Sequence, residues 1–167
     1  MINKAILIFG LMLSQLYYLK AFAIPLNCGN EKRIMGTWHL VSVLEKIDNE
    51  PVRIDPMWVH PDGYLNYGSD NRMMVIIISG NRKVSANHKE TDTQSAALFH
   101  SMTSYAGTYK ISGNKIIHQI DVSWNQKWNN TNQTRYYQIN GNKLTLTLPP
   151  IRKAGSTITR SLQWEKI

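Results

Sequence analysis

The sequence predicts an all-β fold, an antiparallel barrel of about eight to ten strands with one short helix. Runs of alternating apolar and polar side chains recur along the chain, which is typical of half-buried strands. Turn-forming pairs such as Gly113-Asn114 and Asn140-Gly141 separate these runs, as in β-hairpins. A sandwich would also fit this pattern. We favour a barrel because closure removes exposed strand edges that promote aggregation.

The first 23 residues predict a cleavable secretory signal peptide. Lys4 gives a positive start, residues 5–19 form an apolar stretch, and Ala21-Phe22-Ala23 is a small-residue cleavage site. The apolar stretch is interrupted by polar residues and is short for a membrane span of about 20 residues. We therefore expect export to the periplasm or the medium, with an uncleaved anchor as the alternative.

A lead-in over residues 24–35 and one domain over residues 36–167 are expected to follow. Cys28 is the only cysteine, so no intrachain disulfide can form. The net charge of +8 comes from basic residues spread along the chain without a run of five or six, so we expect no nucleic-acid partner. Beyond the signal, the longest apolar run, Met73–Ile78, is too short to span a membrane.

The first half of the domain is predicted to contain four strands. They cover Thr37–Ile47, Tyr64–Tyr67, Arg72–Ser79 and Lys83–Ala86, with a proline-containing loop or broken edge strand after the first. On the first strand, one face carries Trp38, Leu40, Ser42 and Leu44, and the other face is expected to be partly exposed to solvent. The third is continuously apolar in its middle, as in a strand that is covered on both sides.

At the start of the second half, the spacing of the apolar residues changes from the alternation of a strand to that of a helix. Residues Thr91–Met102 favour a helix of about three turns that Asp92 or Thr93 can cap. Four strands are then expected within Ser104–Leu148, and a last strand over Thr157–Glu165. The last strand places Ile158, Arg160, Leu162 and Trp164 on one apolar face.

The second strand of the Ser104–Leu148 stretch alternates strictly. One face carries Ile116, His118, Ile120, Val122 and Trp124. This pattern places His118 in the middle of an apolar face.

Five segments carry a recognisable pattern: GTWHLVSV (Gly36–Val43), DGYLNYGSDNRMM (Asp62–Met74), SYAGTYKISGNKIIH (Ser104–His118), RYYQINGNKLTLTLPP (Arg135–Pro150) and LQWEK (Leu162–Lys166). In this order and spacing they resemble the bacterial and fungal lipocalin-like domain proteins, within the calycin group of antiparallel barrels. The chain departs from the family at Asn71-Arg72, where a glycine-aromatic pair is frequent. The resemblance implies a lipocalin-like barrel, and the family is functionally diverse.

The resemblance also implies a structural plug. Lipocalins pair a Gly-x-Trp on the first strand with an arginine on the last, and Trp38 and Arg160 fit these roles. We expect Arg160 to stack on the indole face and to plug the closed end of the barrel.

The inward faces predict an apolar cup with a few polar groups, the usual composition of a small-molecule site. The candidate ligand-binding residues are His118, Arg135, Tyr105, Tyr109, Tyr137 and Trp124. Each has a structural alternative: His118 as a satisfied core residue, Arg135 as a rim or stacking residue, and the tyrosines as packing.

Three functions remain open. The first is an exported barrel that binds a small, mainly hydrophobic molecule, with Arg135 or His118 contacting a polar or acidic end. The second is a cyclase or isomerase, as in calycin-like relatives, with His118 or a tyrosine as general acid or base. The third is a filled barrel that acts as an envelope or protein-interaction module. The sequence does not identify catalytic residues or the oligomeric state.

Several kinds of chemistry lack a signature. The histidines are not paired at metal-ligand spacing, and no Gly-x-Ser-x-Gly elbow or phosphate-cradling glycine-rich loop is present. We therefore expect no metal and no cofactor.

Overall fold

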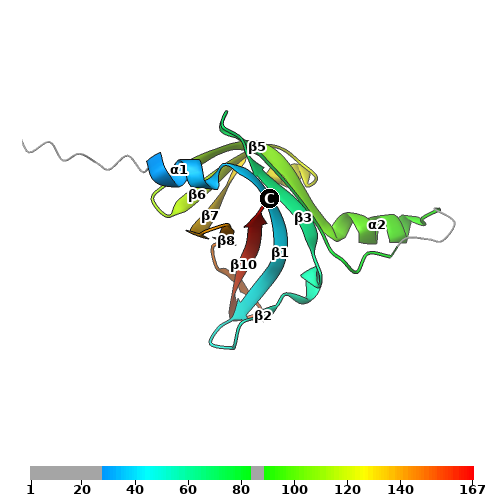
Figure 1. The fold of residues 1–167 in the computed structure, drawn as a ribbon. Helices are drawn as coiled ribbons and strands as arrows, with labels where there is room; N and C mark the ends of the chain where they lie inside the picture. Colours follow the sequence, from blue (N-terminus) through cyan, green and yellow to red (C-terminus); the bar gives the residue numbers. More distant parts are fainter. Residues whose placement is uncertain (1–27, 84–88) are drawn as a thin grey trace, which may run out of the picture.

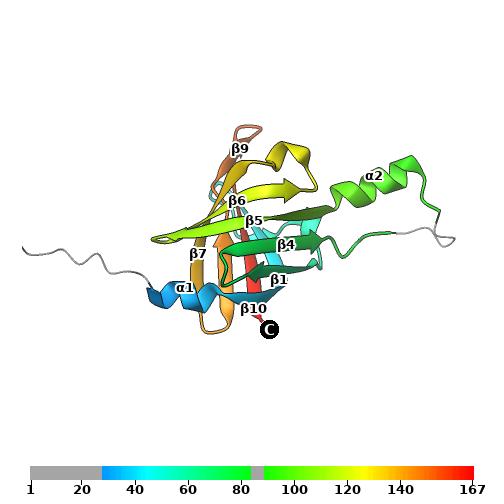
Figure 2. The ribbon, with the colours of Figure 1, turned by 90° about the horizontal axis from the view of Figure 1, so that it is seen from above.

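The computed structural model describes residues 28–83 and 89–167, which form an antiparallel sheet closed into a barrel (Figures 1 and 2). The strands are β1 (Gly36–Ile47), β2 (Arg53–Ile54), β3 (Asp62–Tyr67), β4 (Arg72–Ile78), β5 (Met102–Ser112), β6 (Lys115–Ser123), β7 (Thr131–Asn140), β8 (Lys143–Thr147), β9 (Ile151–Lys153) and β10 (Ser156–Lys166). The helical segments are α1 (Cys28–Ile34), α2 (Asp92–His100) and two short 3-10 turns, η1 (Pro56–Trp58) and η2 (Gln126–Trp128). The all-β prediction is confirmed.

The ring follows the order β1-β3-β4-β5-β6-β7-β8-β10 and closes where β10 pairs with β1. β2 and β9 are short strands that extend β1 and β10 at one end of the barrel. We call this end the mouth. It contains the connections from β1 to β3, β4 to β5, β6 to β7 and β8 to β10. The tight hairpin turns predicted at Gly113 and Gly141 lie at the opposite end, where both glycines adopt positive φ angles.

The two helices lie on opposite sides of the barrel (Figure 1). α1 occupies part of the predicted lead-in and covers the end opposite the mouth, where the indole Nε1–H of Trp38 donates to the Ile34 carbonyl oxygen at 2.8 Å. α2 lies within the predicted helical segment, but its cap is Thr91 and not Asp92 or Thr93. Thr91 and Gln94 form a reciprocal capping box. The predicted signal peptide and most of the predicted strand Lys83–Ala86 lie outside the described residues.

Two bulges change which residues face the interior. In β1 the register shifts between Leu40 and Ser42, so Val43 and Glu45 are buried in place of Ser42 and Leu44. The expected inward face of β1 is therefore wrong beyond Leu40. An extra residue moves every later side chain to the other face.

The second bulge lies between β5 and β6. Ala106 pairs with Val122 while its neighbour Gly107 pairs with Ile120, so one residue of β6 is left over. Val122 is consequently 56% exposed, which corrects its predicted place on the buried face. A Cβ atom at Gly107 would lie 2.0 Å from the Gln119 carbonyl oxygen, so this close approach requires glycine.

The outer face of β4 is not covered. Met74 is 61% exposed and Ile76 is 46% exposed, whereas Met73, Val75 and Ile77 are buried. The expectation of a strand covered on both sides is wrong. β4 lies in a single-layer barrel wall, so only one face meets the core.

Arg160 does not stack on Trp38. β1 and β10 are antiparallel, so Trp38 near the start of β1 pairs with Lys166 near the end of β10, and the Lys166 Nζ lies 5.2 Å from the centroid of the indole ring. Arg160 instead pairs with Glu45, towards the mouth. The prediction that Arg160 covers Trp38 is therefore wrong, because Lys166 takes that position and Arg160 lies towards the mouth. Trp38 itself is fully buried.

Candidate functional site

A cavity of about 410 Å³ occupies the interior of the barrel between its core and the mouth. Every strand of the ring contributes to its lining, which is mainly aliphatic and aromatic. The indoles of Trp58, Trp124 and Trp128 lie on the mouth side, where the connections carry η1 and η2. Trp124 and Trp128 pack edge to face, with ring centroids 4.8 Å apart. The cavity therefore offers an apolar volume with an aromatic entrance.

His118 lines the cavity and is held on both sides by tyrosines. Its Nε2 lies 2.7 Å from the Tyr67 hydroxyl and its Nδ1 lies 3.0 Å from the Tyr105 hydroxyl. A neutral imidazole has one donor and one acceptor nitrogen, so one tyrosine donates to the ring and the other accepts from it. Burial, with a smaller contribution from the positive charge of Arg135, lowers the pKa of His118 to about 3. His118 is therefore a neutral bridge between two hydroxyl groups at neutral pH.

Arg135, on β7, is the other buried polar group of this region, with 8% of its surface exposed. One guanidinium nitrogen donates to the Thr134 carbonyl oxygen at 2.8 Å. Within residues 28–83 and 89–167, no carboxylate forms an ion pair with Arg135, whereas Arg53 and Arg72 each have one such pair and Arg160 has two. Arg135 is therefore a buried cation without an acidic partner in the described part of the chain.

The charge of Arg135 acts on the neighbouring tyrosines. Burial raises the pKa of the Tyr105 hydroxyl, and the charge of Arg135 and a hydrogen bond from it oppose that rise. Burial also raises the pKa of Tyr67, and Arg135 again acts in the opposite direction. Tyr67, Tyr105, His118 and Arg135 thus form one polar cluster. We call these four residues the inner cluster.

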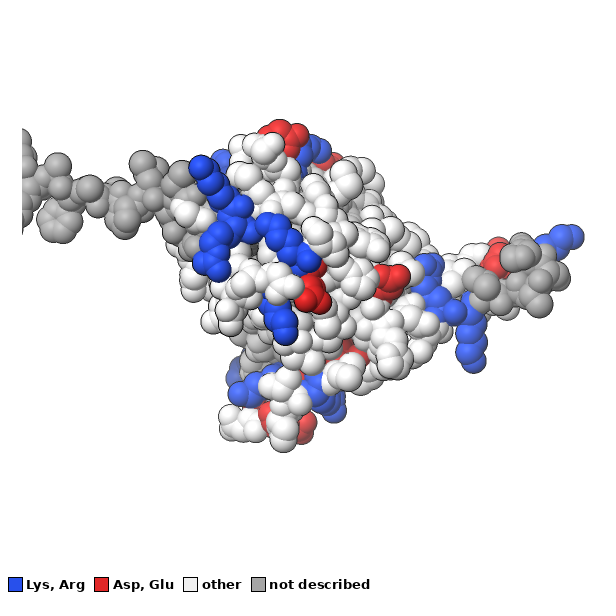
Figure 3. All heavy atoms as spheres, viewed as in Figure 1, with Lys and Arg blue, Asp and Glu red and all other residues white. Residues whose placement is uncertain are grey.

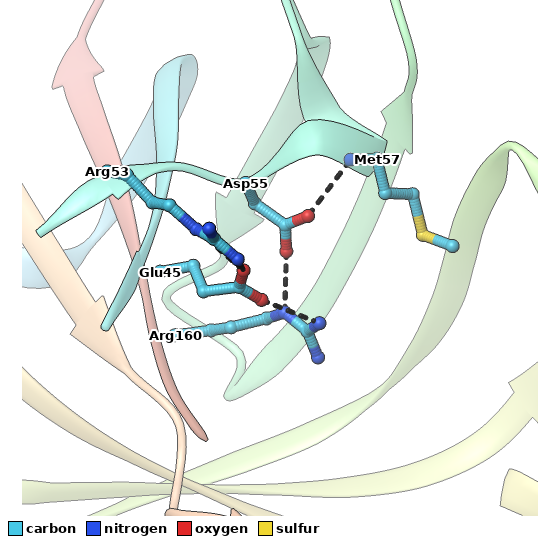
Figure 4. Close-up of polar contacts among 5 residues, drawn as sticks. All are labelled: Glu45, Arg53, Asp55, Met57 and Arg160. Atoms are coloured by element: carbon cyan, nitrogen blue, oxygen red, sulfur yellow. Dashed lines mark hydrogen bonds and ion pairs between the residues drawn. The ribbon is translucent and has the colours of Figure 1, made fainter. Parts of the chain in front are cut away.

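A second polar group lies at the mouth (Figure 4). The Nε of Arg160 donates to Asp55 at 2.5 Å, and its Nη2 donates to Glu45 at 3.1 Å. Glu45 also accepts from Arg53, and Asp55 accepts from the backbone N–H of Met57 at 3.0 Å. We call Glu45, Arg53, Asp55 and Arg160 the mouth cluster. It contains two cations and two carboxylates, so it is neutral as a whole.

The family model of the lipocalin-like domain matches residues 35–167. The chain belongs to this lipocalin-like family. No protein with a curated description matches the chain. Lipocalin-like barrels commonly bind small hydrophobic molecules.

The lipocalin-like barrel brings four of the six predicted site residues to the cavity, namely His118, Arg135, Tyr105 and Trp124. Tyr109 and Tyr137 do not line it. Tyr109 packs on Tyr67 and donates to the Gly68 carbonyl oxygen at 3.0 Å, away from the mouth. The hydroxyl of Tyr137 is buried and has no hydrogen-bond partner among the described residues. The structure therefore separates these two tyrosines from the predicted site.

Sequence reasoning missed Glu45, Asp55 and Trp164. Glu45 was not predicted to face inward because the bulge in β1 reverses the alternation beyond Leu40. Asp55 was not predicted because it lies in a proline-containing loop without a strand pattern. Trp164 was placed on the apolar face of the last strand, but no local pattern indicated that its Nε1–H would have no hydrogen-bond partner among the described residues. Only the position of all three side chains beside the cavity or its mouth reveals a role.

Among the described residues, the charged side chains outside the cavity and its mouth are mostly exposed. Figure 3 shows lysine and arginine side chains beside α1, where the Lys166 Nζ donates to the Arg33 carbonyl oxygen at 3.1 Å. Within the described part of the chain, no three histidine, cysteine or acidic side chains gather as metal ligands. The helices described in the structure are too short or too polar to cross a membrane.

Proposed function

We propose that this barrel binds one small, mainly hydrophobic molecule in its interior, with a polar end at the inner cluster. The supporting observation is a mainly apolar cavity of about 410 Å³ with a few polar groups in its lining, among them His118 and Arg135. Ligand pockets for small molecules typically have volumes of about 300–1,000 Å³ and the same composition. The indoles near the mouth are suited to contact the apolar part of such a molecule.

Two observations favour binding over the alternatives. A filled barrel would leave no volume of this size inside. His118 is poorly suited as the general base of a cyclase or isomerase, because both ring nitrogens are engaged by tyrosines and its pKa is about 3.

A fluorescent probe tests this proposal. The neutral dye N-phenyl-1-naphthylamine is expected to bind saturably with one site per chain. Val75 faces the cavity and its neighbour Met74 faces solvent, so Val75→Trp and Met74→Trp form a matched pair. Filling the cavity by Val75→Trp should abolish dye binding, and Met74→Trp should leave it unchanged. Absence of binding to the wild-type protein, or equal binding by both variants when folded, would refute the proposal.

Export is part of the proposal and is supported by the signal-like residues 1–23. We propose that the mature protein begins at Ile24 and functions in the periplasm or the medium. Intact-mass measurement of protein from the natural cell envelope and culture medium would test this. A full-length mass recovered from the cytoplasm would refute export. The same measurement under native conditions would show any bound molecule as an added mass.

A further inference from the structure

We infer that the ligand of the interior cavity is an amphipathic organic monoanion, such as a carboxylate, and that Arg135 binds its acidic group. The inference rests on the proposed function and adds the charge of the ligand and the residue that recognises it.

The positive charges around the cavity are not all balanced. Three cationic side chains line it, namely Arg135, Lys153 and Arg160. Arg160 is already neutralised by two carboxylates of the mouth cluster, and Lys153 is exposed to solvent at the mouth. Arg135 alone is both buried and without an acidic partner in the described part of the chain. A buried cation is costly without a counter-charge, and a ligand anion would supply that charge.

The described part of the cavity lining also contains an unpaired hydrogen-bond donor. Among the described residues that line the cavity, Trp164 has the only buried side-chain polar atom without a partner, its Nε1–H. An indole N–H is a donor only, and so is a guanidinium. Donors of this kind pair with an acceptor-rich group such as a carboxylate and not with an ammonium group.

The cavity provides for one negative charge on the ligand and not for two. A dianion such as a phosphate monoester would need a second positive charge nearby. His118 does not supply it, because its two nitrogens are engaged by Tyr67 and Tyr105 and it remains neutral. Arg160 does not supply it either, because its charge is balanced. The aliphatic and aromatic remainder of the lining fits a hydrocarbon or aromatic tail.

The test compares two competitors of equal chain length. Dodecanoate and dodecan-1-ol, each below its aggregation concentration at pH 7.5, displace N-phenyl-1-naphthylamine from the purified mature protein. Because charge-assisted hydrogen bonds contribute about 1.5–3 kcal/mol, dodecanoate should bind about 10- to 100-fold more tightly than dodecan-1-ol. Arg135→Gln should remove this preference and leave the affinity for dodecan-1-ol within about threefold of wild type. Lys153→Gln, which removes a cation at the mouth, should retain the preference.

The outcomes separate the two proposals. If the dye does not bind to the wild-type protein, the proposed function fails and the inference fails with it. If the dye binds but the two competitors bind equally, the proposed function stands and the monoanion assignment is wrong. If Lys153→Gln and not Arg135→Gln removes the preference, the assignment to Arg135 is wrong. The wild-type comparison decides the ligand charge even if Arg135→Gln fails to fold.

Discussion

Glu45 and Arg160 are direct register partners across the β1–β10 seam that closes the barrel, and their side chains form an ion pair of 3.1 Å. Asp55, only 3% exposed at its side chain, completes the arrangement by pairing with the same guanidinium at 2.5 Å. The seam is therefore joined by backbone hydrogen bonds and by side-chain charges, and Asp55 connects the β2–η1 segment to it.

We expect Arg160→Met to lower the free energy of unfolding by about 2–4 kcal/mol, because it leaves the buried Asp55 without its cation while Glu45 keeps Arg53. Urea denaturation measures this. Arg72→Met is the control, because it removes the exposed pair with Asp121 and should cost less than about 1 kcal/mol. Equal losses in the two variants would contradict a structural role for the mouth cluster.

Trp38 is fully buried beneath α1, so Trp38→Ala should cost about 3–5 kcal/mol of stability. Trp38→Phe keeps an aromatic ring but removes the hydrogen bond to the Ile34 carbonyl oxygen, and it should cost less. Thermal denaturation of both variants checks this order. A shift of only one or two degrees for Trp38→Ala would show that the closed end is not held by this side chain.

We expect replacement of Arg135 to stabilise the ligand-free protein, although it should weaken binding of an anionic ligand. Arg135→Met removes a buried cation that lacks an acidic partner among the described residues, so the ligand-free protein should gain about 1–3 kcal/mol in unfolding free energy. The exposed Lys153→Met should change it by no more than about 0.5 kcal/mol. Urea denaturation of ligand-free protein decides the matter, and a large loss of stability in Arg135→Met would mean that Arg135 has a structural role.

His118 predicts a pH dependence of stability. Its pKa is lowered to about 3 in the folded protein, against about 6.5 in an unfolded chain, so between these values the unfolded state binds the proton more readily. The stabilisation is therefore complete above about pH 6.5 and is lost as the pH falls towards 3, at up to about 1.4 kcal/mol per pH unit.

Urea denaturation from pH 7.5 to 4 should show a steeper loss of stability for the wild-type protein than for His118→Gln. The variant His100→Gln, which changes an exposed histidine at the end of α2, should keep the wild-type dependence. Identical slopes for the wild type and His118→Gln would show that His118 does not remain neutral in the folded protein.

The local patterns of the chain were sufficient to predict the architecture. Alternation over Ile116–Ile120 placed His118 inside, and the glycines at 113 and 141 marked the hairpins. These features depend on neighbours in sequence, so strand period and turn chemistry are readable without knowledge of the rest of the fold. The same alternation gave the wrong inward face beyond each bulge. The position of a bulge depends on how two strands pair, and the pattern of one strand does not show it.

Strand periodicity and the family pattern were enough to predict the lipocalin-like barrel and to place His118 and Arg135 on inward faces. The contacts across the closed barrel show that Lys166 and not Arg160 lies over Trp38, that Arg160 is neutralised by Glu45 and Asp55, and that Arg135 has no acidic partner in the described chain. These contacts could not be predicted because the pattern of a strand encodes only which face a side chain occupies. Closure of the ring and the register between distant strands determine which charges meet there.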